Sequence, residues 1–305
     1  MTHSFTPAKS SLRFSRLLLL GGLALAPSLR AELITQTGYN GGGESWETGA
    51  DWSNGLPAQA GNDYINNAGL NTLLSRTPEG TSVEFPGDSL TIANTSVIYA
   101  RAATVTIADF RLDNGQMAFA DDTYPEAIEL AGGLTLLAGG GYFNTAHGDY
   151  AGVFEITADI SGVGALNAQM MPIAFADPST TTSTVEIVLS GNNTYEGGTL
   201  AGLRGIVTTM ADGALGTGDV TVSSTGQLNL GGGTTHDYID DAATLTVEAG
   251  GLVDLNFTGT DTVGAVVLDG TEGETGTYGA VGSGADHESA VSPARACSRS
   301  RRSRR

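Results

Sequence analysis

Cysteine and lysine are the scarcest residue types of this 305-residue chain, with one of each. Cys297 is the only cysteine, which excludes an internal disulfide. Lys9 is the only lysine, which excludes helices stabilised by repeated Glu–Lys pairs. Charged residues make up only 15% of the chain, whereas 44 glycines and many threonines and asparagines favour strands and turns. This composition predicts an all-β protein.

The few basic residues are concentrated at the two ends. Four of the 14 lie before residue 32, and six lie among the last eleven residues. The segment between them has four arginines against all 33 acidic residues, a formal charge of −29. Such a surface repels the phosphates of nucleic acid and of anionic lipid, so we expect no nucleic-acid partner.

The amino terminus has the organisation of a secretory signal peptide. A basic flank precedes the short apolar run "LLLLGGLALAP" (17–27), and small residues follow it up to Ala31. We predict a signal covering residues 1–31 with cleavage after Ala31, because a cut after Ala26 would leave Pro27 at the new terminus. The run is too short to span a bilayer, so we expect export without stable membrane insertion. Pro27 and two glycines disfavour the alternative of a buried helix.

The C-terminal half contains an internal repeat. The segment "DVTVSSTGQLNL" (219–230) aligns with "TLTVEAGGLVDL" (244–255) at a spacing of 25 residues. Four apolar positions coincide: Val220 with Leu245, Val222 with Val247, Leu228 with Val253, and Leu230 with Leu255. The alternation within each run indicates a strand with one buried face. A constant period indicates that each unit buries its apolar face against the next, which predicts a β-solenoid.

Short alternating runs bounded by Gly, Asn or Asp continue through most of the chain. They occupy residues 89–94, 103–115, 127–141, 153–166, 183–191 and 263–270. We predict one solenoid over residues 32–290, with coils of about 20–25 residues and a repeat motif at about 183–257. An antiparallel β-sandwich is the alternative, although a sandwich does not require a constant coil length.

The stretch "LSGNNTYEGGT" (189–199) could either hold a ligand or turn a corner. Gly and Asn tolerate the positive φ that a sharp turn requires, and Thr and Tyr suit a strand. Stacked polar side chains at such a corner can satisfy one another's hydrogen bonds. We therefore interpret the motif as backbone geometry. Its residues are Leu189, Gly191, Asn192, Asn193, Tyr195, Gly197 and Gly198.

Together with "GALGTGDVTVSSTGQLNL", this motif resembles the autotransporter-associated β-strand repeat of secreted bacterial passenger domains. "ISGVGAL" (160–166) is similar to the short coil that leads into that repeat. Residues 46–66 and 267–289 are similar to the opening and closing segments of such proteins. Residues 67–152 share only the general pattern of short alternating strands and polar turns. The resemblance implies a right-handed parallel β-helix that is exported, structural or adhesive, and without catalytic residues. Arg204 departs from the pattern, because a small polar residue is common there.

Other chemistry receives little support from the residues. A β-helix can also bind or degrade polysaccharide, which is the alternative function. Degradation requires two paired acidic residues, or a carboxylate cluster that binds a cation beside a basic residue. Acidic residues are so frequent in this chain that a pair of them carries little information, and basic residues are scarce. His236, Asp237, Asp240 and Asp241 are close in sequence but lack the ligand spacing of a known metal loop. We therefore predict no enzyme activity, no cofactor and no metal. An adhesive role implies a surface ligand or a glycan as the partner.

Two aromatic residues near the start of the mature chain allow two interpretations. Trp46 and Trp52, together with Tyr39 and Tyr64, could form a platform on which a sugar stacks. The first coil of a solenoid also needs large side chains to close its core. We favour the second interpretation.

The basic tail at residues 291–305 fits nothing that precedes it. It could bind anionic partners. We favour a frameshift, because a shifted frame permits an alternating strand such as "FTGTGVLTVT". The last coil would then lack its covering strand and expose an unpaired edge. Reading the coding DNA across the Ala290 codon tests this hypothesis: a prompt stop codon in the shifted frame contradicts it.

Overall fold

The computed structural model describes residues 31–38, 45–69, 74–119, 127–145, 151–170 and 183–289, and the backbone of residues 297–300. The predicted signal therefore lies outside the described residues, apart from Ala31. Ala31 is exposed and directly precedes the first strand.

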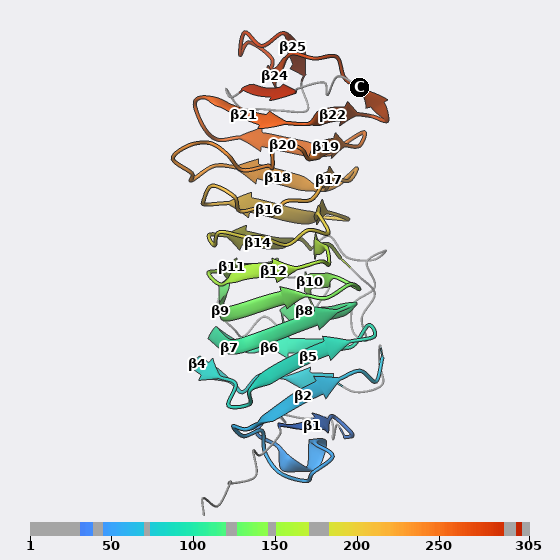
Figure 1. Cartoon of the computed structure of the whole chain (residues 1–305), viewed down its shortest axis with the longest axis vertical. Helices are drawn as coiled ribbons and strands as arrows, with labels where there is room; N and C mark the ends of the chain where they lie inside the picture. The colour runs from blue at the N-terminus through green and yellow to red at the C-terminus, as the bar shows by residue number, and fades with distance from the viewer. Residues whose placement is uncertain are drawn as a thin grey trace, which may run out of the picture. The chain divides into compact units, whose positions relative to one another are not determined.

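Two long sheets of parallel strands run through the described chain (Figure 1). Alternating apolar residues direct one face of each strand inward, as the sequence pattern predicts. The first sheet consists of β1 (Glu32–Thr35), β2 (Asn62–Asn66), β4 (Gly80–Glu84), β5 (Ser89–Ala93), β7 (Ala102–Asp113), β9 (Ala127–Leu136), β11 (Gly152–Ile156), β12 (Asp159–Gly162), β14 (Val185–Leu189), β16 (Gly205–Thr209), β18 (Gln227–Leu230) and β20 (Leu252–Leu255).

The second sheet is built from the strands that alternate with these along the chain. It consists of β3 (Leu74–Arg76), β6 (Val97–Ala100), β8 (Gly115–Phe119), β10 (Gly141–Thr145), β13 (Leu166–Ala168), β15 (Thr199–Ala201), β17 (Val220–Val222), β19 (Thr244–Val247), β22 (Ala265–Leu268) and the short β23 (Thr271–Glu272). From β13 onward the chain alternates between the two sheets up to β20, whereas β4 and β5 both pair with β7, and β11 and β12 both pair with β9.

A third, four-stranded sheet contains β21 (Thr260–Val263) and what we term the C-terminal layer: β24 (Thr277–Ala280), β25 (His287–Ser289) and β26 (Cys297–Ser300). β26 pairs in parallel with β21 and antiparallel with β24. Four residues of the basic tail thus take part in strand pairing, which the sequence did not predict. β20 ends the first sheet, with β18 as its only partner strand among the described residues.

The strand register confirms the 25-residue alignment. Val220 pairs with Leu245 and Val222 with Val247 in the second sheet. Leu228 pairs with Val253 and Leu230 with Leu255 in the first sheet. Antiparallel pairing among the described residues is confined to β22–β23, β24–β26 and an isolated bridge between Gln36 and Trp52. The antiparallel sandwich is therefore wrong, and the parallel sheets are consistent with a β-helix or solenoid.

The spacing between successive windings varies along the chain. A hydrogen bond joins Thr244 to Asp219, 25 residues earlier. Asn193 is bonded to Ile160, 33 residues earlier, and to Ala214, 21 residues later. Residues 171–182, which lie outside the described residues, fall within the longest of these intervals.

One continuous apolar core fills the space between the sheets. Inward residues of neighbouring windings lie on each other, among them Leu90, Phe110, Phe154, Ile187 and Val207, all with at most 1% of their surface exposed. Helical structure among the described residues is limited to the 3-10 turn η1 (Gly49–Asp51). In that part of the chain, no helix has the length and apolar character needed to cross a bilayer.

Candidate functional site

The repeat motif at residues 189–199 uses the side chains of Asn193 and Tyr195 internally. The Asn193 side chain is buried: its Oδ1 accepts a hydrogen bond from the Ile160 N–H (2.8 Å), and its Nδ2 donates to the Ala214 carbonyl (2.7 Å). The Tyr195 hydroxyl lies 2.5 Å from Thr199 Oγ1, which in turn donates to the Leu215 carbonyl. Burial raises the pKa of Tyr195. These groups join three windings and are not available to a ligand.

The glycines of the motif lie where the backbone of one winding approaches the next. A Cβ atom on Gly191 would lie 2.6 Å from the Ala158 carbonyl oxygen, and one on Gly197 would lie 2.2 Å from the Gly164 carbonyl carbon. Gly198 has φ = +87°, a conformation that favours glycine. Leu189 is fully buried, whereas Asn192 is exposed and its backbone N–H donates to Asp159 Oδ1.

The aromatic residues near the start of the described chain form part of the core. Trp46 and Trp52 are each 4% exposed, and Tyr64 is fully buried. Their rings make edge-on contacts: Trp52 with Tyr64, and both Trp46 and Tyr64 with Phe85. The hypothesis of a sugar platform is therefore wrong for these three residues, because a stacking platform needs an exposed ring face. Tyr39 lies outside the described residues.

Arg204, the departure from the repeat pattern, lies in the turn between β15 and β16. Its φ is +54°, a conformation that non-glycine residues seldom adopt. Its backbone N–H donates to Thr225 Oγ1 of the next winding. Arg204 thus lies at a turn, just before the paired strands β14 and β16 meet at Val185 and Gly205.

The segment "HDYIDD" is a corner organised around an aspartate that sequence reasoning did not single out. Asp212 Oδ2 accepts hydrogen bonds from the backbone N–H groups of Thr234 (2.9 Å) and Thr235 (3.0 Å), and its Oδ1 accepts from Asp237 N–H (3.2 Å). These bonds, that of Thr235 first, hold the pKa of Asp212 below its usual range. His236 stacks on Phe257, with ring centroids 5.2 Å apart. Within the described residues, no group of three or more His, Cys, Asp or Glu side chains is placed to hold a metal ion.

Asp261 is the other aspartate of this corner that the sequence did not reveal. It is 1% exposed, and its Oδ2 accepts a hydrogen bond from the Ile239 N–H at 3.2 Å. Its Oδ1 is buried without a hydrogen-bond partner in the described chain. The pKa of Asp261 is raised to about 7: burial is the largest cause, backbone N–H groups partly oppose it, and the nearby Asp237 adds to it. Aspartates are too frequent here for sequence alone to distinguish this one.

A shallow groove lies beside this corner, where β16 and β18 end. It has a volume of about 190 Å³ and contains no charged side chain. Its walls are Thr208, Thr209, Met210, Asn229, Leu230, Gly231, Gly232 and Asn256. Met210 is half exposed, and Asn256 is exposed with no side-chain hydrogen bond in the described chain. Amide and hydroxyl groups beside an apolar side chain can bind an uncharged polyhydroxyl compound.

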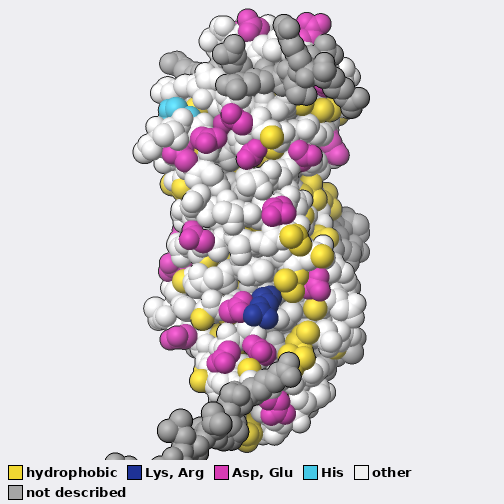
Figure 2. Space-filling view, in the orientation of Figure 1, with side chains coloured by type: hydrophobic (Ala, Val, Ile, Leu, Met, Phe, Trp, Pro, Cys, Tyr) yellow, Lys and Arg dark blue, Asp and Glu magenta, His cyan; other side chains and the backbone are white. Residues whose placement is uncertain are grey.

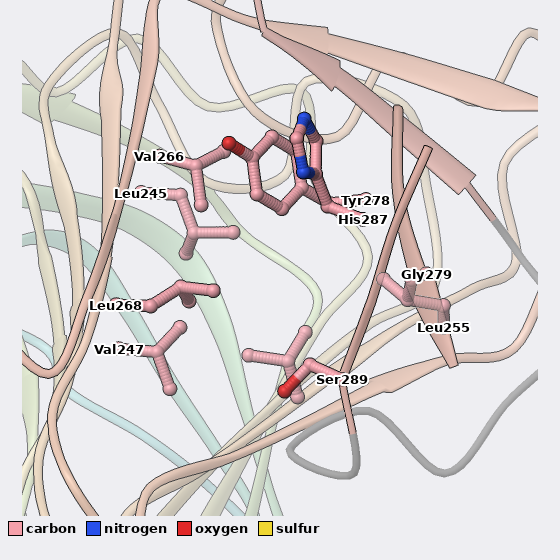
Figure 3. Close-up of a pocket in the computed structure, with 10 residues that line it drawn as sticks. Leu245, Val247, Leu255, Val266, Leu268, Tyr278, Gly279, His287 and Ser289 are labelled. Carbon is pink, nitrogen blue, oxygen red and sulfur yellow. The ribbon is translucent and has the colours of Figure 1, made fainter. Parts of the chain in front are cut away.

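An apolar cavity of about 40 Å³ lies at the C-terminal end of the core (Figure 3). Aliphatic side chains of β19, β20 and β22 line it: Leu245, Val247, Val253, Leu255, Val266 and Leu268. Tyr278 and His287 of the C-terminal layer stack on each other beside these side chains, with ring centroids 4.7 Å apart. The C-terminal layer thus covers an incompletely filled end of the core.

The outer surface is acidic. Figure 2 shows carboxylates spread over the visible face, with basic side chains scarce among them. Two of the arginines pair with neighbouring acids: Arg101 with Glu79 at 3.0 Å, and Arg111 with Asp109. Comparison of the chain with family models, curated proteins and solved structures finds no match to any of them.

Proposed function

We propose that this chain is a secreted or cell-surface structural or adhesive protein without catalytic activity. We further propose that it is a right-handed parallel β-helix with coils of about 20–25 residues and a member of the autotransporter-associated repeat proteins. The observation that carries the proposal is the use of the buried Asn193 side chain of the motif in two hydrogen bonds between windings. Side chains that are buried in hydrogen bonds between windings stabilise the fold and are not free to take part in a reaction.

General chain chirality supports the proposed hand. A connection that leaves a strand and returns to a parallel neighbour in the same sheet is right-handed in nearly all proteins, because strands twist to the right. The consecutive first-sheet strands β14, β16, β18 and β20 are parallel neighbours, and each is joined to the next through a strand of the second sheet. The resemblance of residues 189–230 to the secreted repeat supports the same hand.

Export is proposed from the residues before Ala31 and is directly testable. We would express the full chain in a bacterium, separate the cytoplasm from exported fractions, and determine the amino terminus of the recovered protein. The expected result is an exported chain that begins at Glu32. A cytoplasmic chain that retains residues 1–31 would contradict the proposal. The matched control is a variant with Leu18 and Leu19 replaced by Arg, which interrupts the apolar run and should stay inside.

An adhesive scaffold and an enzyme differ in what happens to a bound polysaccharide. The purified full chain would be applied to a glycan array and incubated with acidic and neutral polysaccharides, with release of reducing or unsaturated ends as the readout. The proposal expects no turnover, with or without binding. Specific turnover that survives repurification would overturn it.

Glycan binding is the second candidate function, and the uncharged groove beside Asn256 favours it. If the protein binds a glycan there, Asn256→Ala should weaken binding by about fivefold or more, since losing a hydrogen bond that the bound glycan covers costs about 1–3 kcal/mol. Gln59→Ala, an exposed amide remote in sequence, is the matched control. Array binding that is equal in both variants would exclude the groove as the site.

A further inference from the structure

The windings are also joined by a column of hydrogen bonds that is separate from the strand pairing of the two long sheets. Asn193 lies in this column and bridges two neighbours: it accepts from Ile160 N–H below and donates to the Ala214 carbonyl above. The next links are the Gly213 N–H, which donates to the Asp237 carbonyl (2.7 Å), and the Ile239 N–H, which donates to Asp261 Oδ2 (3.2 Å). Asp261 is therefore the last side chain in this column before the C-terminal layer.

Asn193 makes two hydrogen bonds to neighbouring windings, whereas Asp261 makes only the one in which its side chain accepts. Oδ2 accepts from the winding below, as Oδ1 of Asn193 does. Oδ1 is the chemical counterpart of the amide nitrogen with which Asn193 donates to Ala214, but it is buried and has no partner in the described residues. A carboxylate has no hydrogen to donate, whereas a protonated carboxyl has one. An orphaned buried oxygen in this position indicates a group that is complete only with a proton.

Burial first, and the nearby carboxylate of Asp237 to a smaller extent, favour the protonated form of Asp261. In the segment before β19, Asp237 lies near enough to repel a negative charge on Asp261, and Asp212, Asp240 and Asp241 in turn surround Asp237. Tyr238 is the other titratable neighbour in that segment. On β26 the residue opposite Asp261 is Ser298, flanked in the strand by Cys297 and Arg299.

We propose that Asp261 is a proton-dependent latch that holds the C-terminal layer on the end of the core. The protonated carboxyl donates from Oδ1 to the backbone of β26, the strand paired with β21, as Asn193 donates to Ala214. Loss of the proton places an unpaired negative charge beside that strand and loosens the layer. Because β24 pairs with β26 and contributes Tyr278, loosening uncovers the aliphatic cavity.

The direction of the pH effect follows from linkage. The pKa of Asp261 is raised from about 4 in the unfolded chain to about 7 in the folded chain. The folded state therefore binds more protons between these values, and stability falls as pH rises through this window. The latch is closed at mildly acidic pH and open in mildly alkaline solution.

Hydrogen exchange of the full chain tests the latch at pH 5.5 and 8.5. After division by the intrinsic exchange rate, amides of β21 and β24 in the wild-type chain should open about 10- to 30-fold more at pH 8.5. Asp261→Asn carries a permanent donor, so its opening should be independent of pH, and its Tm at pH 8.5 should exceed that of wild type. The matched control is Asp254→Asn, on the outer face of the neighbouring strand β20, which should behave as wild type.

Equal pH dependence in Asp261→Asn and wild type would overturn the proposal. A second measurement does not depend on the folding of a variant: the Asp261 carboxyl carbon of the wild-type chain can be titrated by NMR. A midpoint near neutral pH supports the latch, and an ordinary aspartate midpoint of about 4 overturns it.

Discussion

Asn193 and Asn192 are adjacent in the chain but have opposite surroundings. Asn193 is buried and makes two hydrogen bonds to neighbouring windings, whereas the Asn192 side chain is exposed. Asn193→Ala leaves the Ile160 N–H and the Ala214 carbonyl unsatisfied, and we expect it to lower the free energy of unfolding by about 2–4 kcal/mol. Asn192→Ala is the matched control and should change it little. Urea denaturation measures both, and equal effects would contradict a scaffold role for Asn193.

Asp212 is the residue on which the neighbouring corner depends. Asp212→Ala removes the acceptor of three backbone N–H groups and should lower the free energy of unfolding at pH 7 by about 1–2 kcal/mol. Because these bonds depress the pKa of Asp212, its stabilising contribution is present at neutral pH and is lost on acidification below about 4. Asp241→Ala, an exposed neighbour, should cause no loss. Denaturation at pH 7 and at about pH 2 tests this, and a deficit that persists undiminished at the lower pH would contradict it.

At the scale of strands and turns, close approach between windings limits which glycines can be replaced. A methyl group on Gly197 would lie 2.2 Å from the Gly164 carbonyl carbon, whereas one on Gly231 would make ordinary contact at 3.4 Å with Asn256. We expect Gly197→Ala to destabilise the protein by about 1–3 kcal/mol through overpacking and Gly231→Ala to be tolerated. Thermal unfolding of the two variants compares them. Tolerance of both would mean that the windings can separate at this turn.

For the whole molecule, charge opposes folding. The segment 32–290 has a formal charge of −29, and its carboxylates repel one another more strongly when the chain is compact. We expect Tm at pH 7 to rise by several degrees as NaCl is raised from about 20 to 300 mM, because salt screens this repulsion. The same salt change near pH 4.3, the sequence isoelectric point, should have little effect. A Tm that falls with salt at pH 7 would show that ion pairs outweigh repulsion.

Strand positions were predictable because alternation carries their signal. Val185, Ile187 and Leu189 alternate with outward residues, and β14 covers Val185–Leu189 with the same burial pattern. The alignment of Val220 with Leu245 also predicted a true pair, since identical windings must place equivalent apolar residues on each other. Tertiary structure was needed to show that a basic tail segment, Cys297–Ser300, pairs with β21, because its sequence has no alternation of this kind.

The amino-acid sequence by itself determined the class of this protein: short alternating strands, Gly and Asn corners, and apolar positions that repeat at 25 residues between 220 and 255. Only the tertiary structure decided which polar corner residues are buried and what they bond. Asn193, Asp212 and Asp261 obtain their partners from windings separated by unequal stretches of chain, between 21 and 33 residues. Such contacts depend on the vertical register of the windings, which local sequence patterns do not encode.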